Sequence, residues 1–527
     1  MMYKEPWVVS AVLLFAGSCA ASPAQEEFGP SIESALQNAP QIFNAVHNAM
    51  RQFGSSLHHN GMSFFQATIP TGTLLYHGAP TTDIPANLEW LAFEIEHAEN
   101  FAHGRWRKAP NDDGDMVFQE HIQTPLQPGR QRMQSILNSP EETQTLHTRD
   151  VGSRWVHDGW IREPGYLQLY QAARPLNVLY LDGMAAGKTN MGTNDAEDYI
   201  LTGNKTRHGF DDLLRAADLC NWARNWKIDG FVRMEPGFEV VYCDFQDGGL
   251  HQLSATRRSS GGYSREAIVF PLFKWLQAAS KRYHGIGGSR VLIDYSSMVS
   301  AFFYPLNLTN PNTTFSEHPR LVAASESELA NIKEHVERLT PKQRQRPASS
   351  IDWQGVTDMV VSRYADRLAF MATIDSIETM NMSLNHLLET FMDFKEEHEV
   401  DFADAMQKCA SHYLAGAVPR TLEDELIFAG ISGTTHNICQ TLFEAHELVA
   451  RNPNADDKSL AEALSLVHGL MAQLGWSKWK ECGACKVDEI CFIAMWPFGN
   501  VEDHYNPSCL NASTAAGRNT YWRWEWW

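Results

Sequence analysis

The pattern of apolar and polar positions divides the chain into a strand-rich first part and a helical second part. Short runs of β-branched and aromatic residues, bounded by Gly, Pro and Asp, are typical of strands and occur up to about residue 300. Between them, apolar residues that recur about every 3.6 positions predict helices. The expected strands cover 74–77, 89–93, 166–171, 177–181, 231–234, 238–245, 250–255 and 290–295, and the expected helices cover 31–52, 94–102, 211–226 and 267–280.

From about residue 325 onward the spacing of apolar residues is helical throughout. Ser325 with Glu328 resembles a capping box, which favours a helix start at this point. Further helices are expected over 357–372, 374–394, 402–415, 435–451 and 460–474. We therefore expect an α+β fold in which an N-terminal mixed-sheet domain is followed by an all-α domain and a Cys-rich tail.

A chain of 527 residues is long enough to form two or more domains, each with its own core. The change from strands to helices places the main boundary near residues 310 to 325. The expected parts are an α+β domain over 21–315, a helical domain over 316–480, and a Cys-rich, Trp-rich tail over 481–527. A polar stretch over about 108–164, rich in Pro, Gly, Asp and Gln, is expected to be a long surface insertion in the first domain.

Residues 1–20 have the pattern of a secretory signal peptide. Lys4 is followed by the apolar run Val8–Ala16 and by small residues around Ala20, where a signal peptidase could cut. The alternative is a buried N-terminal strand or helix. Five Asn-x-Ser/Thr sequons agree with an extracellular location and with glycosylation: Asn204, Asn307, Asn312, Asn381 and Asn511.

The net charge of −20 argues against two classes of partner. An acidic surface repels the phosphates of nucleic acids and the head groups of anionic membranes. No segment after the signal peptide is long and apolar enough to span a bilayer, so we expect no membrane contact in the mature form.

Eight cysteines remain after removal of Cys19 with the signal peptide, and an even number behind such a signal favours disulfides. We expect Cys220 to pair with Cys243 and Cys409 to pair with Cys439. The other four, Cys482, Cys485, Cys491 and Cys509, lie in the tail. Their spacing would also suit a zinc ion, but disulfides are favoured in an oxidising compartment, and no metal site is expected.

Three segments contain candidate site residues. His77 ends an apolar strand and precedes Gly78, which could let a ligand approach the backbone. Glu239 is a carboxylate in an otherwise apolar strand, where it could stabilise a cationic centre; Glu235 could act in its place. Trp90 and Phe93 could stack on a flat ring. The alternatives are a histidine satisfied by backbone atoms, a solvent-facing acid, and aromatic rings that pack in the core.

Together these segments resemble the ADP-ribosyltransferase fold, in the branch whose motifs run His, Tyr, Glu. Tyr76-His77-Gly78 is similar to the first motif, Trp90-Leu-Ala-Phe93 to the second, and Glu239-Val-Val-Tyr to the last. The second motif departs from the branch, because no tyrosine stands in it. The chain also looks like a group of secreted fungal proteins of unknown function, with which it shares Leu-Asp-Gly-Met-Ala-Ala-Gly-Lys.

The resemblance implies that NAD is the substrate. His77 would orient the ribose with help from Tyr76 and Gly78, Trp90 or Phe93 would flank the nicotinamide, and Glu239 would stabilise the transition state. The chain would then be an ADP-ribosyltransferase or NAD glycohydrolase, with an acceptor that the residues do not specify. A non-catalytic binding protein on the same scaffold is the alternative. A carbohydrate-active protein is a third possibility, suggested by the acidic and aromatic residues.

Two other motifs carry less weight. Gly183-Met-Ala-Ala-Gly187-Lys188-Thr189 resembles a phosphate-binding loop but has one residue too few between its glycines. Asp195, Glu197 and Asp198 form an acidic cluster that could hold calcium, although a solvated loop is the favoured interpretation.

Overall fold

The computed structural model describes residues 28–108, 160–207, 209–258, 265–340, 351–394, 400–452 and 455–522. The expected signal peptide over 1–20, all but the ends of the expected insertion over 108–164, and residues 523–527 of the tail lie outside these ranges.

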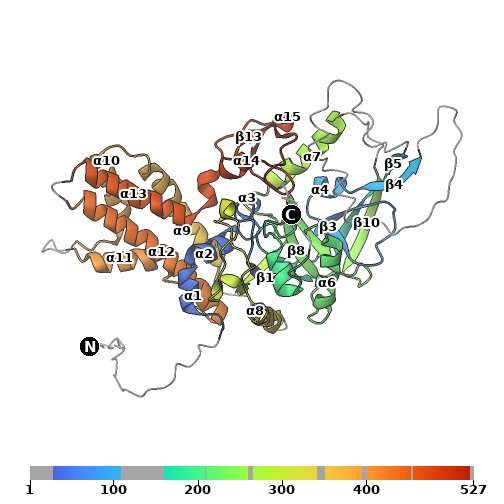
Figure 1. Ribbon diagram of the computed structural model, residues 1–527, viewed down its shortest axis with the longest axis horizontal. Helices are drawn as coiled ribbons and strands as arrows, with labels where there is room; N and C mark the ends of the chain where they lie inside the picture. Colours follow the sequence, from blue (N-terminus) through green and yellow to red (C-terminus); the bar gives the residue numbers. More distant parts are fainter. Residues whose placement is uncertain are drawn as a thin grey trace, which may run out of the picture.

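A nine-stranded mixed sheet forms the first part of the chain, as the sequence predicts (Figure 1). Neighbouring strands run antiparallel except β7 and β8, which are parallel and need a crossover. Helix α6 (Asp212–Arg224) lies in that crossover. In spatial order the strands are β10 (Leu250–Arg257), β6 (Tyr166–Ala172), β2 (Leu74–Ala79), β3 (Glu89–Ala92), β9 (Gly237–Tyr242), β8 (Gly230–Glu235), β7 (Leu176–Leu181), β1 (Ser63–Ile69) and β11 (Leu292–Ser300).

The second part of the chain is helical and lies at the left of Figure 1. Its helices are α9 (Trp353–Met371), α10 (Ile377–Leu388), α11 (Phe402–Ser411), α12 (Leu422–Val449) and α13 (Asp457–Leu474), and α8 (Glu326–Leu339) precedes them near the sheet. The expected capping box at Ser325 and Glu328 is present at the start of α8. The α+β order of sheet followed by helices is thus confirmed.

The N-terminal helices connect the two parts. Sequence spacing predicts one helix over 31–52, but three form: α1 (Ile32–Gln37), α2 (Ala39–Asn48) and α3 (Gln52–Leu57). Pro40 lies in the first turn of α2, where proline begins a helix readily but cannot continue one. Helix α2 packs closely on α12, because a Cβ on Gly430 would lie 2.6 Å from Cγ2 of Ile42. The buried core is continuous across residue 315, so the predicted domain boundary there stays a prediction.

The predicted hairpin is confirmed. Strands β8 and β9 pair from Gly230↔Tyr242 to Glu235↔Gly237 around Pro236. Gly237 has a φ of +91°, a backbone conformation that favours glycine. Strand β1 has no counterpart among the predicted strands, although both of its neighbours in the sheet, β7 and β11, match predicted runs. Helices α4 (Ile95–Glu99) and α7 (Arg265–Ser280) contact each other and strands β2, β3 and β9.

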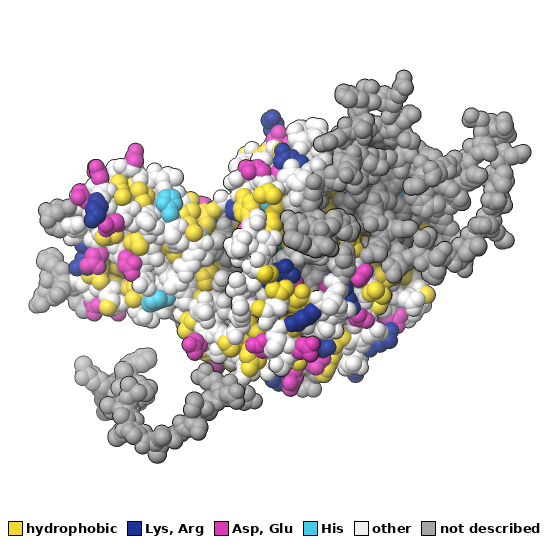
Figure 2. All heavy atoms as spheres, in the orientation of Figure 1, with side chains coloured by type: hydrophobic (Ala, Val, Ile, Leu, Met, Phe, Trp, Pro, Cys, Tyr) yellow, Lys and Arg dark blue, Asp and Glu magenta, His cyan; other side chains and the backbone are white. Residues whose placement is uncertain are grey.

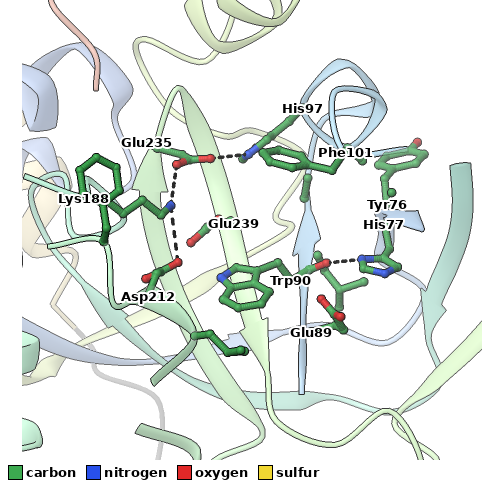
Figure 3. Close-up of a pocket in the computed structure, with 16 residues that line it drawn as sticks. Tyr76, His77, Glu89, Trp90, His97, Phe101, Lys188, Asp212, Glu235 and Glu239 are labelled. Carbon is green, nitrogen blue, oxygen red and sulfur yellow. Dashed lines mark hydrogen bonds and ion pairs between the residues drawn. The ribbon is translucent and has the colours of Figure 1, made fainter. Parts of the chain in front are cut away.

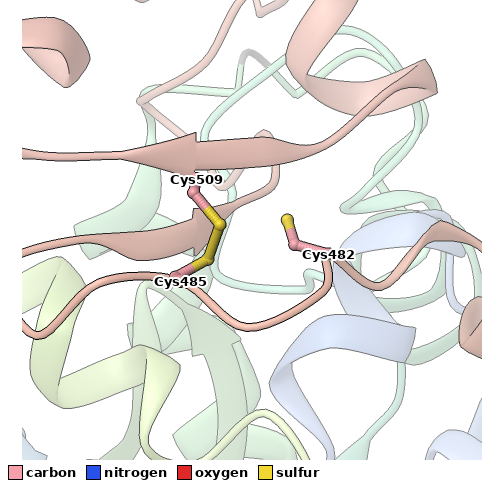
Figure 4. Close-up of side chains that lie close together, drawn as sticks. All are labelled: Cys482, Cys485 and Cys509. Atoms are coloured by element: carbon pink, nitrogen blue, oxygen red, sulfur yellow. A yellow bond between two sulfur atoms is a disulfide. The ribbon is translucent and has the colours of Figure 1, made fainter.

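Four disulfides cross-link the described part of the chain. Both pairs that the sequence suggests are among them: Cys220–Cys243 and Cys409–Cys439. In the tail, Cys482 pairs with Cys491, and Cys485 pairs with Cys509. Figure 4 shows the Cys485–Cys509 bond with Cys482 beside it. Because all four sulfurs are in disulfides, the zinc alternative for the tail is excluded.

Beyond α13 the chain returns to the sheet and packs as a small unit. It contains β12 (Ile490–Phe492), β13 (Ser508–Leu510), α14 (Val501–Tyr505) and α15 (Ala512–Ala515). Outside the sheet, β4 (His103–Lys108) pairs with β5 (Trp160–Pro164) at the two ends of the expected insertion. Acidic side chains are scattered over the helical part in Figure 2, with few basic ones among them. In the described ranges, no helix combines the length and the apolar character that crossing a membrane requires.

Candidate functional site

A pocket lies where strands β2, β3 and β9 meet, beside α4 and the start of α6. Its cavity volume is about 120 Å³. Figure 3 shows Trp90 in the middle of this pocket, with acidic side chains on the side of β9. Five of the predicted site residues border it: Tyr76, His77, Gly78, Trp90 and Glu239. The sixth, Phe93, is not among the lining residues.

Phe93 belongs to the core instead. Its side chain is 1% exposed, and the guanidinium of Arg290 lies 5.5 Å from its ring centroid. Core packing, the alternative that the sequence left open, therefore describes Phe93, and Trp90 is the aromatic residue that faces the pocket.

His77 and Glu239 border one pocket but lie on opposite faces of the sheet. Tyr76 is directly opposite Ala92, and Ala92 is directly opposite Glu239, so these three side chains share a face. Because side chains alternate along a strand, the ring of His77 points to the other face.

The contacts of His77 agree with this placement. Its Nδ1 lies 2.7 Å from the backbone oxygen of Trp90, and its ring lies 5.9 Å from that of Phe245. A histidine held by backbone atoms is the alternative that the sequence left open for this position. The assignment of His77 to the ribose stays a prediction, and Tyr76 is the neighbour that shares a face with Glu239.

Gly78 allows a close approach of protein backbone. A Cβ at this position would lie 2.3 Å from the carbonyl oxygen of Ala98 and 2.6 Å from the nitrogen of Ala102. The segment that includes α4 therefore rests directly on β2. This packing accounts for the glycine without any ligand.

Gly78→Ala is expected to lower the free energy of unfolding by about 1–3 kcal/mol. The added methyl group would clash with backbone atoms, which cannot relieve the clash by changing rotamer as a side chain can. Gly469→Ala is the control, since no atom lies within 4 Å of the added Cβ in α13. The control should be neutral or slightly stabilising, because alanine is the better helix former. Urea unfolding of both variants measures the difference, and equal stabilities would contradict the packing account.

A network of buried charges forms the polar side of the pocket. Oε1 of Glu239 accepts hydrogen bonds from Arg233 at 2.7 and 3.1 Å. Arg233 also pairs with Glu197 and Asp212, both at 3.1 Å. Among the described residues, Oε2 of Glu239 has no hydrogen-bond partner. The carboxylate is thus held by one oxygen, which leaves the other for a ligand.

Glu235 is the centre of a second group of charges in the same pocket. Lys188 donates to its Oε2 at 2.9 Å and lies 3.6 Å from Asp212. Nε2 of His97 lies 2.9 Å from Oε1 of Glu235, and the indole of Trp275 stacks on the His97 ring at 4.9 Å. Both oxygens of Glu235 are therefore engaged, in contrast to those of Glu239.

The two carboxylates differ in their preference for a proton. Burial is the main influence on Glu239 and raises its pKa, although Arg233 opposes the shift. Burial alone would also raise the pKa of Glu235, but Lys188 and the bond to His97 outweigh it and leave that pKa lowered. Neighbouring acids whose pKa values are pushed apart are suited to different roles in acid–base chemistry.

Sequence reasoning missed the basic members of this network. The sequence places Lys188 only in an incomplete phosphate-binding loop. Arg233 lies within the predicted strand 231–234, which is completely buried in the structure. A buried guanidinium requires acidic partners, and these could have been sought among the acidic residues of the sequence. The acidic cluster also differs from the solvated loop expected: Glu197 and Asp198 are buried and pair with Arg215.

The pocket offers donor atoms for a metal, but cationic side chains of the protein already pair with two of its carboxylates. One donor atom each of His97, Glu235 and Glu239 lie within 4.8 Å of one another. The ammonium of Lys188 occupies the place of a counter-ion beside Glu235. The pocket therefore suits an organic ligand with a flat or cationic part better than a metal ion.

Comparisons with known proteins give relatives without a stated activity. Residues 27–271 match the family model described as the YPL277C N-terminal domain. The chain is 25% identical to the uncharacterized protein YOR389W of Saccharomyces cerevisiae, over 89% of this chain and 83% of that protein. It is 32% identical to the uncharacterized protein YPL277C of the same yeast, over 42% of this chain and 43% of that protein.

No solved structure matches the chain. The matches therefore agree with the expected similarity to fungal proteins of unknown function and give no support to the resemblance to ADP-ribosyltransferases.

Proposed function

We propose that the chain is an enzyme that splits or transfers from NAD at the pocket formed by β2, β3 and β9, with Glu239 as its catalytic carboxylate. The observation that carries the proposal is that only one carboxylate oxygen of Glu239 is hydrogen-bonded: Arg233 donates to Oε1, while Oε2 has no partner among the described residues. Three aromatic residues, Tyr76, Trp90 and Phe101, line the same pocket as this acid.

This arrangement suits cleavage of the bond between ribose and nicotinamide. Nicotinamide leaves with the electron pair of that bond, and a cationic oxocarbenium-like centre develops on the ribose. A carboxylate beside the ribose stabilises this charge, and water or an acceptor hydroxyl completes the reaction by adding oxygen to the sugar and losing a proton. Trp90 is placed to stack on the departing ring.

Tyr76 takes over the contact that the resemblance assigns to His77. It shares a face with Glu239 through the register of β2, β3 and β9, so its hydroxyl and the carboxylate can approach the same substrate. Gly78 contributes by letting α4 close over the strand. His97 and Lys188 act as positioning residues, because both bind Glu235 and keep it ionised next to Glu239.

A non-catalytic binding protein is the second candidate. The observation that favours it is the backbone contact of His77, which leaves the first motif of the enzyme branch incomplete. The two candidates differ in their response to NAD: the enzyme would bind and split it, whereas a non-catalytic scaffold would give no binding heat.

Titration calorimetry with NAD and an assay of released nicotinamide test both candidates. The wild-type chain should bind one NAD and release nicotinamide, and Trp90→Ala should weaken binding by about tenfold because stacking is lost. Phe270→Ala is the control, since that ring is 55% exposed on α7. The absence of binding heat would contradict the enzyme and favour the non-catalytic candidate, and binding without release of nicotinamide would contradict the proposed activity.

We also propose that the protein follows the secretory route and is glycosylated. Four disulfides support this, because such bonds persist mainly in oxidising compartments. The sequons at Asn307 and Asn312 lie on exposed residues, where a glycan has space. Enzymatic removal of N-linked glycans from the secreted protein should lower its mass, and an unchanged mass would contradict glycosylation.

A further inference from the structure

A second and larger cavity lies away from the proposed NAD pocket, between the N-terminal helices, the end of α13 and the tail. Its volume is about 520 Å³. The end of α13, residues 471–475, forms one wall, and α14 from the tail forms another. The cavity is thus built from three parts of the chain that are distant in sequence.

Three side chains that can bind a metal converge on this cavity: Glu317, His318 and His504. One donor atom from each lies within 4.8 Å of the other two. Nε2 of His318 is 3.7 Å from Oε1 of Glu317. The histidines are 4% and 1% exposed, respectively. We propose that these residues bind a divalent transition-metal ion, with Zn²⁺ as the ion that best suits two imidazoles and one carboxylate.

The donor set and the spacing both favour zinc. Two imidazoles and a carboxylate with an open fourth position are a common arrangement for zinc sites that bind an outside ligand. Donors at about 2.0–2.1 Å from one zinc ion stand about 3.4 Å apart at the tetrahedral angle. The three side chains need only a modest approach to reach that spacing, and the cavity leaves room for a water or an organic ligand on the ion.

Neighbouring residues orient the donors, as is usual for metal ligands. The hydroxyl of Tyr505 donates to Oε1 of Glu317 at 2.5 Å. The hydroxyl of Tyr521 lies 3.2 Å from Nε2 of His318 and 2.9 Å from Nε2 of His59. Because the bond to His59 is the shorter one, Tyr521 keeps a partner when the metal takes the nitrogen of His318.

A second observation points independently to a ligand in this cavity. Nδ1 of His504 is buried and has no hydrogen-bond partner among the described residues. The same holds for three further atoms of lining residues: Oδ1 of Asn44, Nδ2 of Asn48 and Nε1 of Trp476. Buried polar atoms usually have partners, so the unpartnered nitrogen of His504 is a buried group that still lacks one.

The site also gives the tail a role. His504 lies on α14, which starts with a capping box between Asn500 and Asp503. Asp503 pairs in turn with Arg518. The Cys482–Cys491 and Cys485–Cys509 disulfides tie the same tail together. The tail therefore holds a donor at a fixed place against the loop that contains Glu317 and His318.

Metal binding to the full chain tests the proposal, after removal of bound metal with a chelator and dialysis. Titration calorimetry with ZnCl₂ should show one site per chain, and Co²⁺ should give visible absorption bands typical of nitrogen and oxygen donors. His504→Ala and Glu317→Gln should each weaken Zn²⁺ binding by at least about 100-fold and remove the Co²⁺ bands. His468→Ala is the matched control, since that histidine is exposed on α13.

Glu317→Gln is included because it should leave the chain folded even if His504→Ala does not. The Glu317 side chain is 46% exposed, and its replacement removes no packing. A circular-dichroism spectrum of each variant checks that it is folded. Zn²⁺ binding that is equally tight in the wild type, in Glu317→Gln and in a folded His504→Ala would overturn the proposal. The absence of any Zn²⁺ binding to the wild type would overturn it as well.

Discussion

Arg233→Met is expected to lower the free energy of unfolding by about 3–5 kcal/mol, the usual cost of removing one partner from a buried ion pair. Arg233 is fully buried in β8 and forms ion pairs with Glu197, Asp212 and Glu239. Methionine fills a similar volume but has no charge, so three buried carboxylates would lose a shared cation. Urea unfolding at pH 7 measures the loss.

Arg174→Met is the matched control, at an arginine in the connection between β6 and β7. The Arg174 side chain is 38% exposed, and it pairs with Asp229 and Asp247. Because solvent screens such a pair, its loss should cost no more than about 1 kcal/mol. If both variants lost the same stability, the buried network would not stabilise the sheet as described.

Asp182→Asn is expected to flatten the dependence of stability on pH between about 4 and 7. Asp182 follows β7, and its Oδ1 accepts the backbone N–H of Ser63 at 2.8 Å. Burial raises the pKa of this carboxyl from 3.8 to about 7. The folded chain then keeps a proton that the unfolded chain gives up, so this group contributes stability at low pH that is lost as pH rises toward 7.

The size of the effect follows from the shift in pKa. A difference of one pKa unit corresponds to about 1.4 kcal/mol, so the wild-type free energy of unfolding should fall by about 3 kcal/mol through this group between pH 4 and 7. The asparagine variant should lack this decrease and be the more stable protein at pH 7. Asp218→Asn is the control, since its side chain is 51% exposed. Parallel pH profiles for the wild type and Asp182→Asn would contradict the prediction.

The sequence predicted much of the fold, because its elements follow from local patterns. Pro236 and Gly237 mark the β8–β9 hairpin, and Ser325 with Glu328 marks the start of α8. The position of β1 between β7 and β11 could not be predicted, because strand order depends on long-range pairing. The break near Pro40 was missed because the apolar spacing continues on both sides of it.

The candidate site was predicted in part, for a physical reason that concerns register. Glu239 and Trp90 are neighbours in the pocket, as their sequence context suggested. The side chain of His77 points to the other face of the sheet, and that of its neighbour Tyr76 points to the same face as Glu239. The sequence of a strand cannot show which of two adjacent residues faces a pocket. The partner of Glu239 lies on another strand: Arg233 is on β8, and it pairs in turn with Asp212 on α6, so only the tertiary structure brings these groups together.

Nicotinamide release from NAD by the wild type and by Glu239→Gln tests the central claim most directly. The account predicts turnover by the wild type, a loss of at least about 100-fold in Glu239→Gln, and similar NAD binding by both. Glu96→Gln, on α4 outside the set of pocket residues, should turn over NAD like the wild type. Equal release of nicotinamide by the wild type and Glu239→Gln would contradict the assignment of Glu239, and no release by the wild type would contradict the proposed activity.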